Sequence, residues 1–294
     1  MTYDTRILRL GHSPDPDDAF MWWPLVPDAS GRARIDTGAW RFAHILEDIQ
    51  SLNVRCDKAE LEITALSIHQ YPYVADRYAL TSCGASLGEG YGPMVIAPAG
   101  RKQKLATEDL KKVPCIAVPG TRTTAFLALS LLLGKDAFRY EAVPFDQIIP
   151  AVLAGQYEAG LIIHEGQITY AREGLDLVVD LGKWWMDRTG LPLPLGGNAI
   201  RRDLGLEAMR EICGILKHSI EYALAHRPEA VAYALKFGRG LDDALASEFV
   251  GMYVNHWTLD YGPRGRQAVS ELLKQGAQAG VVPDCGTIDF VDPV

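Results

Sequence analysis

Residues 115–134 read CIAVPGTRTTAFLALSLLLG and hold one complete strand–turn–helix unit. The apolar run at 115–118 predicts a buried strand, and Pro119 with Gly120 predicts a tight turn. The apolar residues from 125 onward predict a helix, and Gly134 is well suited to end it. A strand that passes through a short turn into a helix is the repeating unit of α/β folds.

The same alternation of strands and helices continues on both sides of this unit. Before it we predict strands at 6–11, 40–44, 61–66, 78–83 and 94–99, and after it strands at 140–145, 159–163 and 175–181. Helices are predicted from Ala19, at 45–52, from Ser67 and at 146–154. This order favours parallel α/β sheets. Later residues change in character and predict helices at 207–226, 228–238, 242–256 and 264–279, and then a strand at 288–292.

Two stretches rich in glycine and proline, 88–93 and 190–197, enclose a block of about one hundred residues. A domain inserted into another one requires the chain to cross between them twice. We therefore predict a two-domain α/β protein in which residues 1–97 plus 196–294 form the first domain and 98–195 form the inserted one. Ligands in such folds bind at the carboxyl ends of strands, in the cleft between the domains.

The composition excludes several functional classes. The formal net charge is −8, and an acidic chain repels nucleic acid and anionic membrane surfaces. The start has no basic segment before a long apolar one, and the most apolar run, 125–133, is too short to span a bilayer. The five cysteines are scattered and form no metal-binding pattern. We expect a cytoplasmic protein with neither a nucleic-acid nor a membrane partner.

The first candidate site is SPDPDD, residues 13–18, which directly follows the first predicted strand. Two prolines make a rigid turn, and carboxylates are favourable at a helix start, so a structural role explains the aspartates equally well. In the functional interpretation, Asp18 accepts hydrogen bonds from ligand hydroxyls. No second acidic cluster is present to complete a metal coordination shell, so no metal is predicted.

The second candidate site is PGTRTT, residues 119–124, where a glycine turn opens a helix. Free backbone N–H groups together with hydroxyls bind anions there. The lysine and second glycine of a phosphate-binding loop are missing, so a carboxylate is the expected guest. One threonine is enough to cap a helix, so the three threonines favour binding by Gly120, Thr123 and Thr124 over capping alone.

The third candidate is His164 in IIHEG, residues 162–166, at the carboxyl end of a predicted buried strand. A lone histidine is as often structural, but an imidazole at this place suits general-base work. Glu165 points to the opposite face of an extended chain and is no partner for it. The glycines at 84–93 lack the helix of a dinucleotide-binding fingerprint, so no nicotinamide cofactor is expected. The paired residues Trp22–Trp23 and Trp184–Trp185 are interpreted as core.

Several of these segments together resemble the 1,4-dihydroxy-6-naphthoate synthase family of the futalosine pathway to menaquinone. The sister family, chorismate dehydratase, usually lacks the HEG motif and fits less well. The likeness covers most of residues 6–205 and is carried by LRLGHSPDPDDAF, LEITALSIHQYPYVADRYAL, GASLGEGYGPMVIA, AVPGTRTTAFLAL and AGLIIHEGQITYAREGLDLVVDLGKWWMDRTGLPLPLGGNAIRRDL.

The resemblance implies a periplasmic-binding-protein fold of type II and a carbon–carbon lyase without a cofactor. Such an enzyme cleaves cyclic dehypoxanthine futalosine to 1,4-dihydroxy-6-naphthoate. The family's essential histidine falls on His164, its threonine pair on Thr123 and Thr124, and its strand-end serine on Ser67. The family opening Ser-Pro-Cys-Pro-Asn-Asp-Thr-Phe is changed here, because Asp15, Asp17 and Ala19 replace its cysteine, asparagine and threonine.

We therefore expect the ligand carboxylate to bind at Thr123 and Thr124, while Ser13, Asp18 and Ser67 hold the sugar-derived part and His164 removes a proton. The partner expected is a small anionic molecule, and a homodimer is left open. Two alternatives remain at this stage: a non-catalytic receptor for a small anion, and a chorismate dehydratase-like enzyme.

Overall fold

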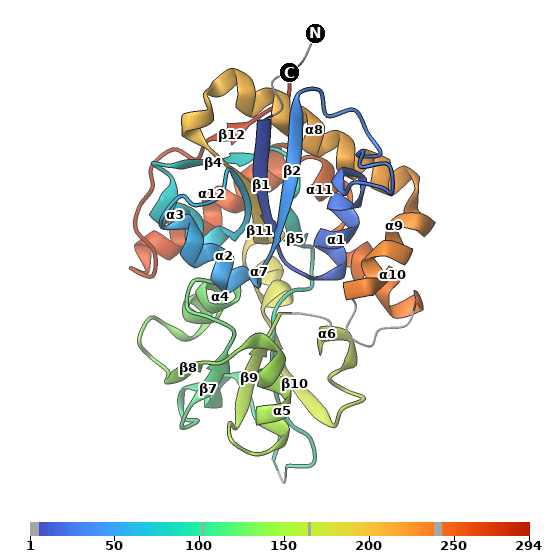
Figure 1. The fold of residues 1–294 in the computed structure, drawn as a ribbon. Helices are drawn as coiled ribbons and strands as arrows, with labels where there is room; N and C mark the ends of the chain where they lie inside the picture. The colour runs from blue at the N-terminus through green and yellow to red at the C-terminus, as the bar shows by residue number, and fades with distance from the viewer. Residues whose placement is uncertain (1–5, 102, 164–165, 238–242) are drawn as a thin grey trace.

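The computed structural model describes residues 6–101, 103–163, 166–237 and 243–294 and contains two β-sheets, one above the other in Figure 1. The large sheet has the strand order β12-β4-β11-β3-β1-β2, with β5 also paired to β11, and the small sheet has the order β10-β6-β9-β7-β8. The large sheet consists of β1 (Arg6–His12), β2 (Trp40–Leu46), β3 (Ile63–Ser67), β4 (Tyr78–Thr81), β5 (Ser86–Gly88), β11 (Leu193–Arg201) and β12 (Phe290–Val291). The small sheet consists of β6 (Met94–Pro98), β7 (Ile116–Val118), β8 (Tyr140–Ala142), β9 (Ala159–Ile162) and β10 (Leu175–Asp180).

Helices pack around both sheets. Those in the first two-thirds of the chain are α1 (Pro16–Trp22), α2 (Ile49–Cys56), α3 (Tyr71–Val74), α4 (Thr124–Leu133), α5 (Ile148–Leu153), α6 (Gly166–Thr169) and α7 (Leu181–Thr189). The helical C-terminal part comprises α8 (Leu206–Ala225), α9 (Arg227–Ala234), α10 (Asp243–Tyr253), α11 (His256–Leu259) and α12 (Gly262–Gln278), all of which surround the large sheet (Figure 1).

The prediction of parallel sheets is only partly right. β1 runs parallel to β2 and β3, and β7 runs parallel to β8 and β9. However, β11 is antiparallel to β3, β4 and β5, and β6 is antiparallel to β9 and β10. The antiparallel strands are the ones next to the two crossings between sheets. Both sheets are therefore mixed.

One local prediction is wrong because of strand pairing. The helix predicted at 45–52 begins only at Ile49, because pairing with β1 keeps the chain extended as far as Leu46. Asp48 then caps the helix by accepting from the N–H groups of Gln50 and Ser51. The stretch 190–197, interpreted as one of the two crossings between the domains, contains the start of β11. In both stretches pairing with another strand determines the backbone.

The predicted domain limits remain a prediction. They fall near the two places where the chain passes between sheets, before β6 and at the start of β11. At these crossings the two connecting segments touch: a Cβ at Gly92 would lie 2.9 Å from the Cα and N atoms of Gly182. The glycine-rich stretch therefore allows the two segments to pack backbone against backbone.

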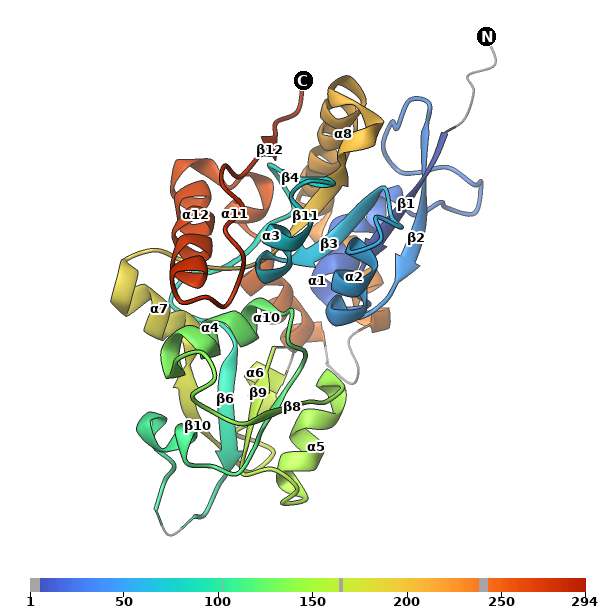
Figure 2. The same ribbon diagram turned by 90° about the vertical axis from the view of Figure 1, so that its left-hand side faces the viewer.

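One hydrophobic cluster joins the two sheets. It includes Leu66 and Leu80 from the large sheet, Val95 and Ile116 from the small sheet, and Leu127 of α4. Figure 2 shows α4 between the two sheets, and it contacts β11, α7, α12 and β9. Of the tryptophans interpreted as core, Trp22 and Trp185 are fully buried. In the described part of the chain, no helix is both long and apolar enough to cross a membrane.

Candidate active site between the two sheets

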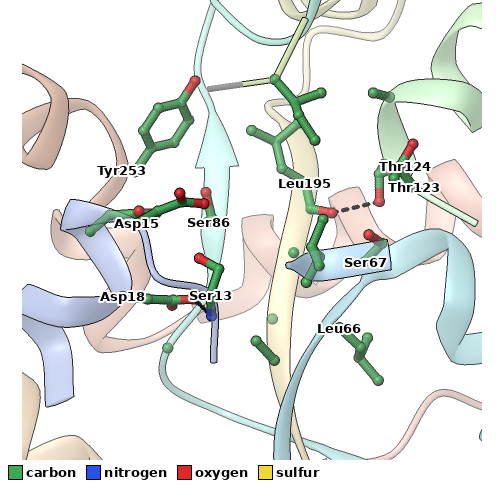
Figure 3. A pocket seen from close by; sticks show the side chains of 18 of the residues that line it. Ser13, Asp15, Asp18, Leu66, Ser67, Ser86, Thr123, Thr124, Leu195 and Tyr253 are labelled. Carbon is green, nitrogen blue, oxygen red and sulfur yellow. Dashed lines mark hydrogen bonds between the residues drawn. The ribbon is translucent and has the colours of Figure 1, made fainter. Parts of the chain in front are cut away.

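A cavity of about 820 Å³, counting its opening to solvent, lies where β1 and β3 end and α4 begins (Figure 3). Two of its sides differ in chemistry. One, which we call the donor wall, consists of Ser67, Thr123, Thr124 and Ala125. The other, the acidic wall, consists of Ser13, Asp15, Asp17 and Asp18 from the turn after β1. Apolar side chains such as Leu66 and Leu195 lie between them.

In the donor wall, Thr123 is the N-cap of α4. Its hydroxyl accepts from the Phe126 N–H at 3.2 Å and donates to the Gly120 carbonyl at 2.9 Å. The capping role considered from the sequence is therefore real, and the hydroxyl hydrogen of Thr123 is used inside the protein. The residue still lines the cavity.

The hydroxyl of Thr124 is likewise held by hydrogen bonds within the protein. It donates to the Leu195 carbonyl at 2.5 Å and accepts from the His69 N–H at 3.2 Å. His69 Nδ1 also bonds the Thr123 carbonyl at 2.9 Å, and burial lowers the pKa of His69 to about 4, so the ring is neutral and donates there. The groups left to bind an anion are the N–H groups of Thr124 and Ala125, which have no carbonyl partner within the helix. The helix dipole favours negative charge at this end.

Ser67 ends β3 beside the threonine pair (Figure 3). A 3₁₀ turn, Ile68–Gln70, begins directly after it. The prediction that a short helix begins after Ser67 is therefore confirmed. The Ser67 side chain makes no capping hydrogen bond. The hydroxyl instead accepts from Asn53 Nδ2 at 3.0 Å.

Gly120 is placed behind the wall and is not among the described residues that line the cavity. Its φ of 144° lies in the region that side chains disfavour, and an added Cβ would collide with the Gln50 side chain. Gln50 Oε1 in turn accepts from the Arg122 N–H at 3.2 Å. The glycine thus shapes the loop that presents the two threonines.

The acidic wall concentrates carboxyl groups at the start of α1. Asp18 accepts from the Ser13 N–H at 2.8 Å, and burial, with Asp15 nearby, raises the pKa of Asp18 to about 6. Burial and the neighbouring Asp18 and Asp15 also raise the pKa of Asp17 well above its usual range. These groups hold protons at mildly acidic pH and become mutually repelling above it. Ligand hydroxyls would relieve that repulsion by donating to them.

A pair of histidines supports the acidic wall from behind. His12 Nδ1 bonds the Ser13 carbonyl at 3.0 Å, and His12 Nε2 lies 3.0 Å from His44 Nδ1. Burial lowers the pKa of His12 to about 3 and that of His44 to about 4, so both rings are neutral at pH 7. No sequence pattern indicates this pair, since residues 12 and 44 meet only once β1 and β2 have paired.

Tyr253 of α10 lines the cavity near Asp15 (Figure 3). Its hydroxyl donates to Gln167 Oε1, and Gln167 Nε2 donates to the Ile162 carbonyl at 3.5 Å. This contact connects a helix of the C-terminal part to the segment after β9. No local pattern indicates this contact, because Tyr253 lies within a helix and Gln167 is far away in the sequence.

The predicted base, His164, lies outside the described residues. Its neighbour in sequence, Ile163, lines the cavity, and so does Gln167. The assignment of His164 as the base therefore stays a prediction. Among the described residues, no group of three or more His, Cys, Asp and Glu side chains is arranged to hold a metal ion.

The sequence profile of a family described as menaquinone biosynthesis matches residues 8–278. This chain belongs to the menaquinone biosynthesis family. A 1,4-dihydroxy-6-naphthoate synthase of Thermus thermophilus is 41% identical to it, with 93% of this chain and 95% of that protein covered. The same-named protein of Streptomyces coelicolor is 34% identical, with 97% and 98% covered. The family predicted from the motifs is confirmed, and with it the prediction of a biosynthetic enzyme.

Solved structures confirm the predicted fold class. A crystal structure of a protein from Archaeoglobus fulgidus superposes with a TM-score of 0.85 at 42% identity, covering 94% of this chain and 98% of that one. An alkanesulfonate-binding protein of Xanthomonas axonopodis superposes with a TM-score of 0.68 at 11% identity, and 96% of each chain is covered. A Candida albicans protein with the generic periplasmic binding protein fold superposes with a TM-score of 0.69 at 12% identity, covering 95% of this chain and 92% of that one. The last two show a shared fold alone. This family member thus has the two-sheet fold of periplasmic binding proteins.

Proposed function

We propose that this protein is a 1,4-dihydroxy-6-naphthoate synthase, a lyase that converts cyclic dehypoxanthine futalosine to 1,4-dihydroxy-6-naphthoate in menaquinone biosynthesis. The observation that carries the proposal is 41% identity, over nearly the whole of both chains, to a protein of that name. The cavity has chemistry that suits such a substrate, which carries a carboxylate at one end and hydroxyls at the other.

In this proposal the carboxylate binds at the donor wall, where the first N–H groups of α4 point away from the helix. The sugar-derived hydroxyls face the acidic wall, where Asp18 and its neighbours accept hydrogen bonds. The apolar lining between the walls, including Leu66 and Leu195, packs against the aromatic ring. Each part of the substrate therefore meets a complementary surface.

The proposed reaction begins when the two domains predicted around the two sheets close on the substrate and exclude water. His164 then acts as the general base and removes a proton. The electron pair left by that proton opens the sugar-derived ring by breaking a carbon–carbon bond. The sugar-derived part leaves as a small neutral fragment while the naphthalene ring becomes aromatic, so the step needs no oxidant. General-base catalysis of this kind contributes about 10²–10⁴-fold to the rate.

The test is to incubate the purified protein with cyclic dehypoxanthine futalosine and to follow 1,4-dihydroxy-6-naphthoate by mass spectrometry. Wild-type protein should form the product, and His164→Ala should lose turnover by about 10²-fold or more while it still binds the substrate. Binding without product in the wild type would point to a receptor and would refute the proposed function. A parallel incubation with chorismate distinguishes the chorismate dehydratase-like alternative.

The same proposal includes a cytoplasmic location and a small anionic molecule as the partner, without nucleic acid or membrane. The biosynthetic relatives support it. A homodimer also remains a proposal, and sedimentation equilibrium of the purified protein tests it directly.

A further inference from the structure

Asn53, on α2, is completely buried behind the donor wall. Its side-chain amide makes three hydrogen bonds. Nδ2 donates to Ser67 Oγ at 3.0 Å and to the Arg122 carbonyl at 3.3 Å, and Oδ1 accepts from the Ser67 N–H at 2.9 Å. One side chain thus connects the end of β3 to the loop that carries the two threonines.

The orientation of this amide is determined by its partners. The Ser67 backbone N–H can only donate, so it must face the oxygen of Asn53. The Arg122 carbonyl can only accept, so it must face the nitrogen. A flipped amide would place donor against donor and acceptor against acceptor. The Asn53 nitrogen therefore donates to the Ser67 hydroxyl, and the hydroxyl oxygen receives that hydrogen bond.

This arrangement decides where the hydrogen of the Ser67 hydroxyl goes. It cannot point at Asn53, which already presents a hydrogen to the oxygen. No acceptor among the described residues takes it, and Ser67 lines the cavity. The hydrogen is therefore available to a ligand, whereas the hydroxyl hydrogens of Thr123 and Thr124 are donated to the carbonyls of Gly120 and Leu195.

We propose that Asn53 is a positioning residue for the substrate: it turns the Ser67 hydroxyl into a hydrogen-bond donor aimed at the substrate carboxylate. The same amide fixes the distance between Ser67 and the start of α4. Ser67 then serves the carboxylate, rather than the sugar-derived part expected from the sequence. The carboxylate receives three donors, the Ser67 hydroxyl and the N–H groups of Thr124 and Ala125. This inference rests on the proposed function for the identity of the anion, but not for the geometry of the donors.

The loop has other anchors, so the loss of Asn53 should leave it in place. The Arg122 guanidinium lies over the Tyr73 ring at 3.6 Å and donates to Gln70 Oε1 at 3.3 Å, and the Arg122 N–H bonds Gln50. A variant at Asn53 therefore alters the polarity of the site before it alters the shape of the loop.

The test compares Asn53→Asp, Asn53→Ala and Ser67→Ala. In Asn53→Asp the new oxygen accepts the Ser67 hydroxyl hydrogen and turns it away from the substrate, so KM should rise about 10- to 100-fold with a smaller change in kcat. In Asn53→Ala the hydroxyl can still rotate toward the cavity, so KM should rise only a few-fold. A purely structural role would instead make KM follow the loss of thermal stability across the three variants.

The decisive measurement is the double variant. In a Ser67→Ala background, Asn53→Asp and Asn53→Ala should each raise KM much less than they do alone. Effects that multiply would overturn the inference, because simple charge repulsion or loosening of the fold acts whether or not the hydroxyl is present. If Asn53→Asp does not fold, the KM effect of Asn53→Ala is compared in the same way with and without the Ser67 hydroxyl.

A second readout separates this inference from the proposed function. The binding of 2-naphthoate, an aromatic carboxylate without the reacting groups, can be followed by calorimetry. If the wild type makes no naphthoate product but Asn53→Asp weakens 2-naphthoate binding only when Ser67 is present, the proposed function fails and the inference holds. If product forms but the variants act independently, the inference fails and the function holds.

Discussion

The two walls of the cavity are built in opposite ways. In the donor wall the hydroxyls of Thr123 and Thr124 donate to carbonyls of the protein, and the Ser67 hydroxyl accepts from Asn53. Gln50 and His69 hold the loop around the threonines. The acidic wall gathers carboxyl groups whose pKa values are raised by burial and by one another. The donor wall is therefore ready to bind before the ligand arrives, while the acidic wall is relieved of repulsion only by protons or by ligand donors.

The departures from the family opening all lie on or beside the acidic wall. Asp15 and Asp17 stand where the family pattern has cysteine and asparagine, and both line the cavity. The threonine pair and Ser67 of the donor wall follow the pattern. Under the proposed function, the wall assigned to the anion keeps the residues of the family pattern, while the wall assigned to the sugar-derived hydroxyls carries two additional carboxyl groups.

The largest expected effect comes from moving a carboxylate into the donor wall. Ala125→Asp places it in the first turn of α4, where the helix dipole favours negative charge. Ala125 is buried, so thermal denaturation must first show that the variant is folded. The new carboxylate would occupy the anion site, and KM for the substrate should rise at least about 100-fold, since like charges about 4 Å apart repel by about 4 kcal/mol near a protein surface. The control Ala125→Asn has the same size without the charge. Equal KM values for the two variants would show that space, not charge, is limiting.

The raised pKa of Asp18 in the acidic wall should make the free energy of unfolding depend on pH. Asp18 has a folded-state pKa of about 6, above the ordinary 3.8, so the folded protein holds the proton more tightly than the unfolded chain. Stability should therefore fall as pH rises from about 4 to about 6, by up to about 3 kcal/mol. Asp18→Asn should flatten this part of the profile, as measured by urea unfolding across the pH range. A profile unchanged by the substitution would contradict the raised pKa.

A smaller effect is expected at Gly120, which supports the donor wall from behind. Gly120→Ala adds a Cβ against Gln50 at an unfavourable φ, and the free energy of unfolding should fall by about 1–3 kcal/mol. Thermal denaturation measures the loss. The double variant Gly120→Ala with Gln50→Ala removes the collision and should recover part of the stability. If nothing is recovered, the contact with Gln50 is not the cause.

The smallest effect is expected where the acidic wall meets the segment after β9. Tyr253→Phe removes the hydroxyl that donates to Gln167 but keeps the ring, which packs against Phe249 at 5.0 Å. The loss of one buried hydrogen bond should cost about 1–2 kcal/mol, measured as stability, and kcat/KM should fall a few-fold. Tyr91→Phe is the matched control, since its hydroxyl bonds Met252 and not Gln167. If kcat/KM is the same in Tyr253→Phe and Tyr91→Phe, the Tyr253 hydroxyl has no specific role in activity.

Much of the fold could be predicted because its signals are local. The unit at 115–134 combines an apolar strand, a glycine with positive φ and a threonine cap, and each determines the backbone within a few residues. Asp18, Thr123 and Thr124 could be named because they follow predicted strands, and ligands bind where strands of the two sheets end. Ser13 and Ser67 are named from the resemblance to the family.

The rest depended on distant contacts. β11 contains Pro194 and two glycines, which are uncommon inside strands. Gly197 leaves room for the Tyr261 side chain, and Gly196 packs against the Leu66 carbonyl. Asn53 and His12 look like ordinary polar residues until β3, α2 and β2 come together. A sequence pattern shows which residue types are present, whereas the partner of a buried amide or imidazole is set by the tertiary structure.

The hydrophobic cluster that runs from the large sheet through α4 into the small sheet has a consequence for cooperativity. Melting either half would expose apolar surface that the other half needs, at a cost of about 25 cal/mol for each Å² uncovered. The chain should therefore denature in one calorimetric transition, with the van't Hoff enthalpy close to the measured one. α4, whose first N–H groups face the proposed anion site, is then also the element that couples the unfolding of the two halves.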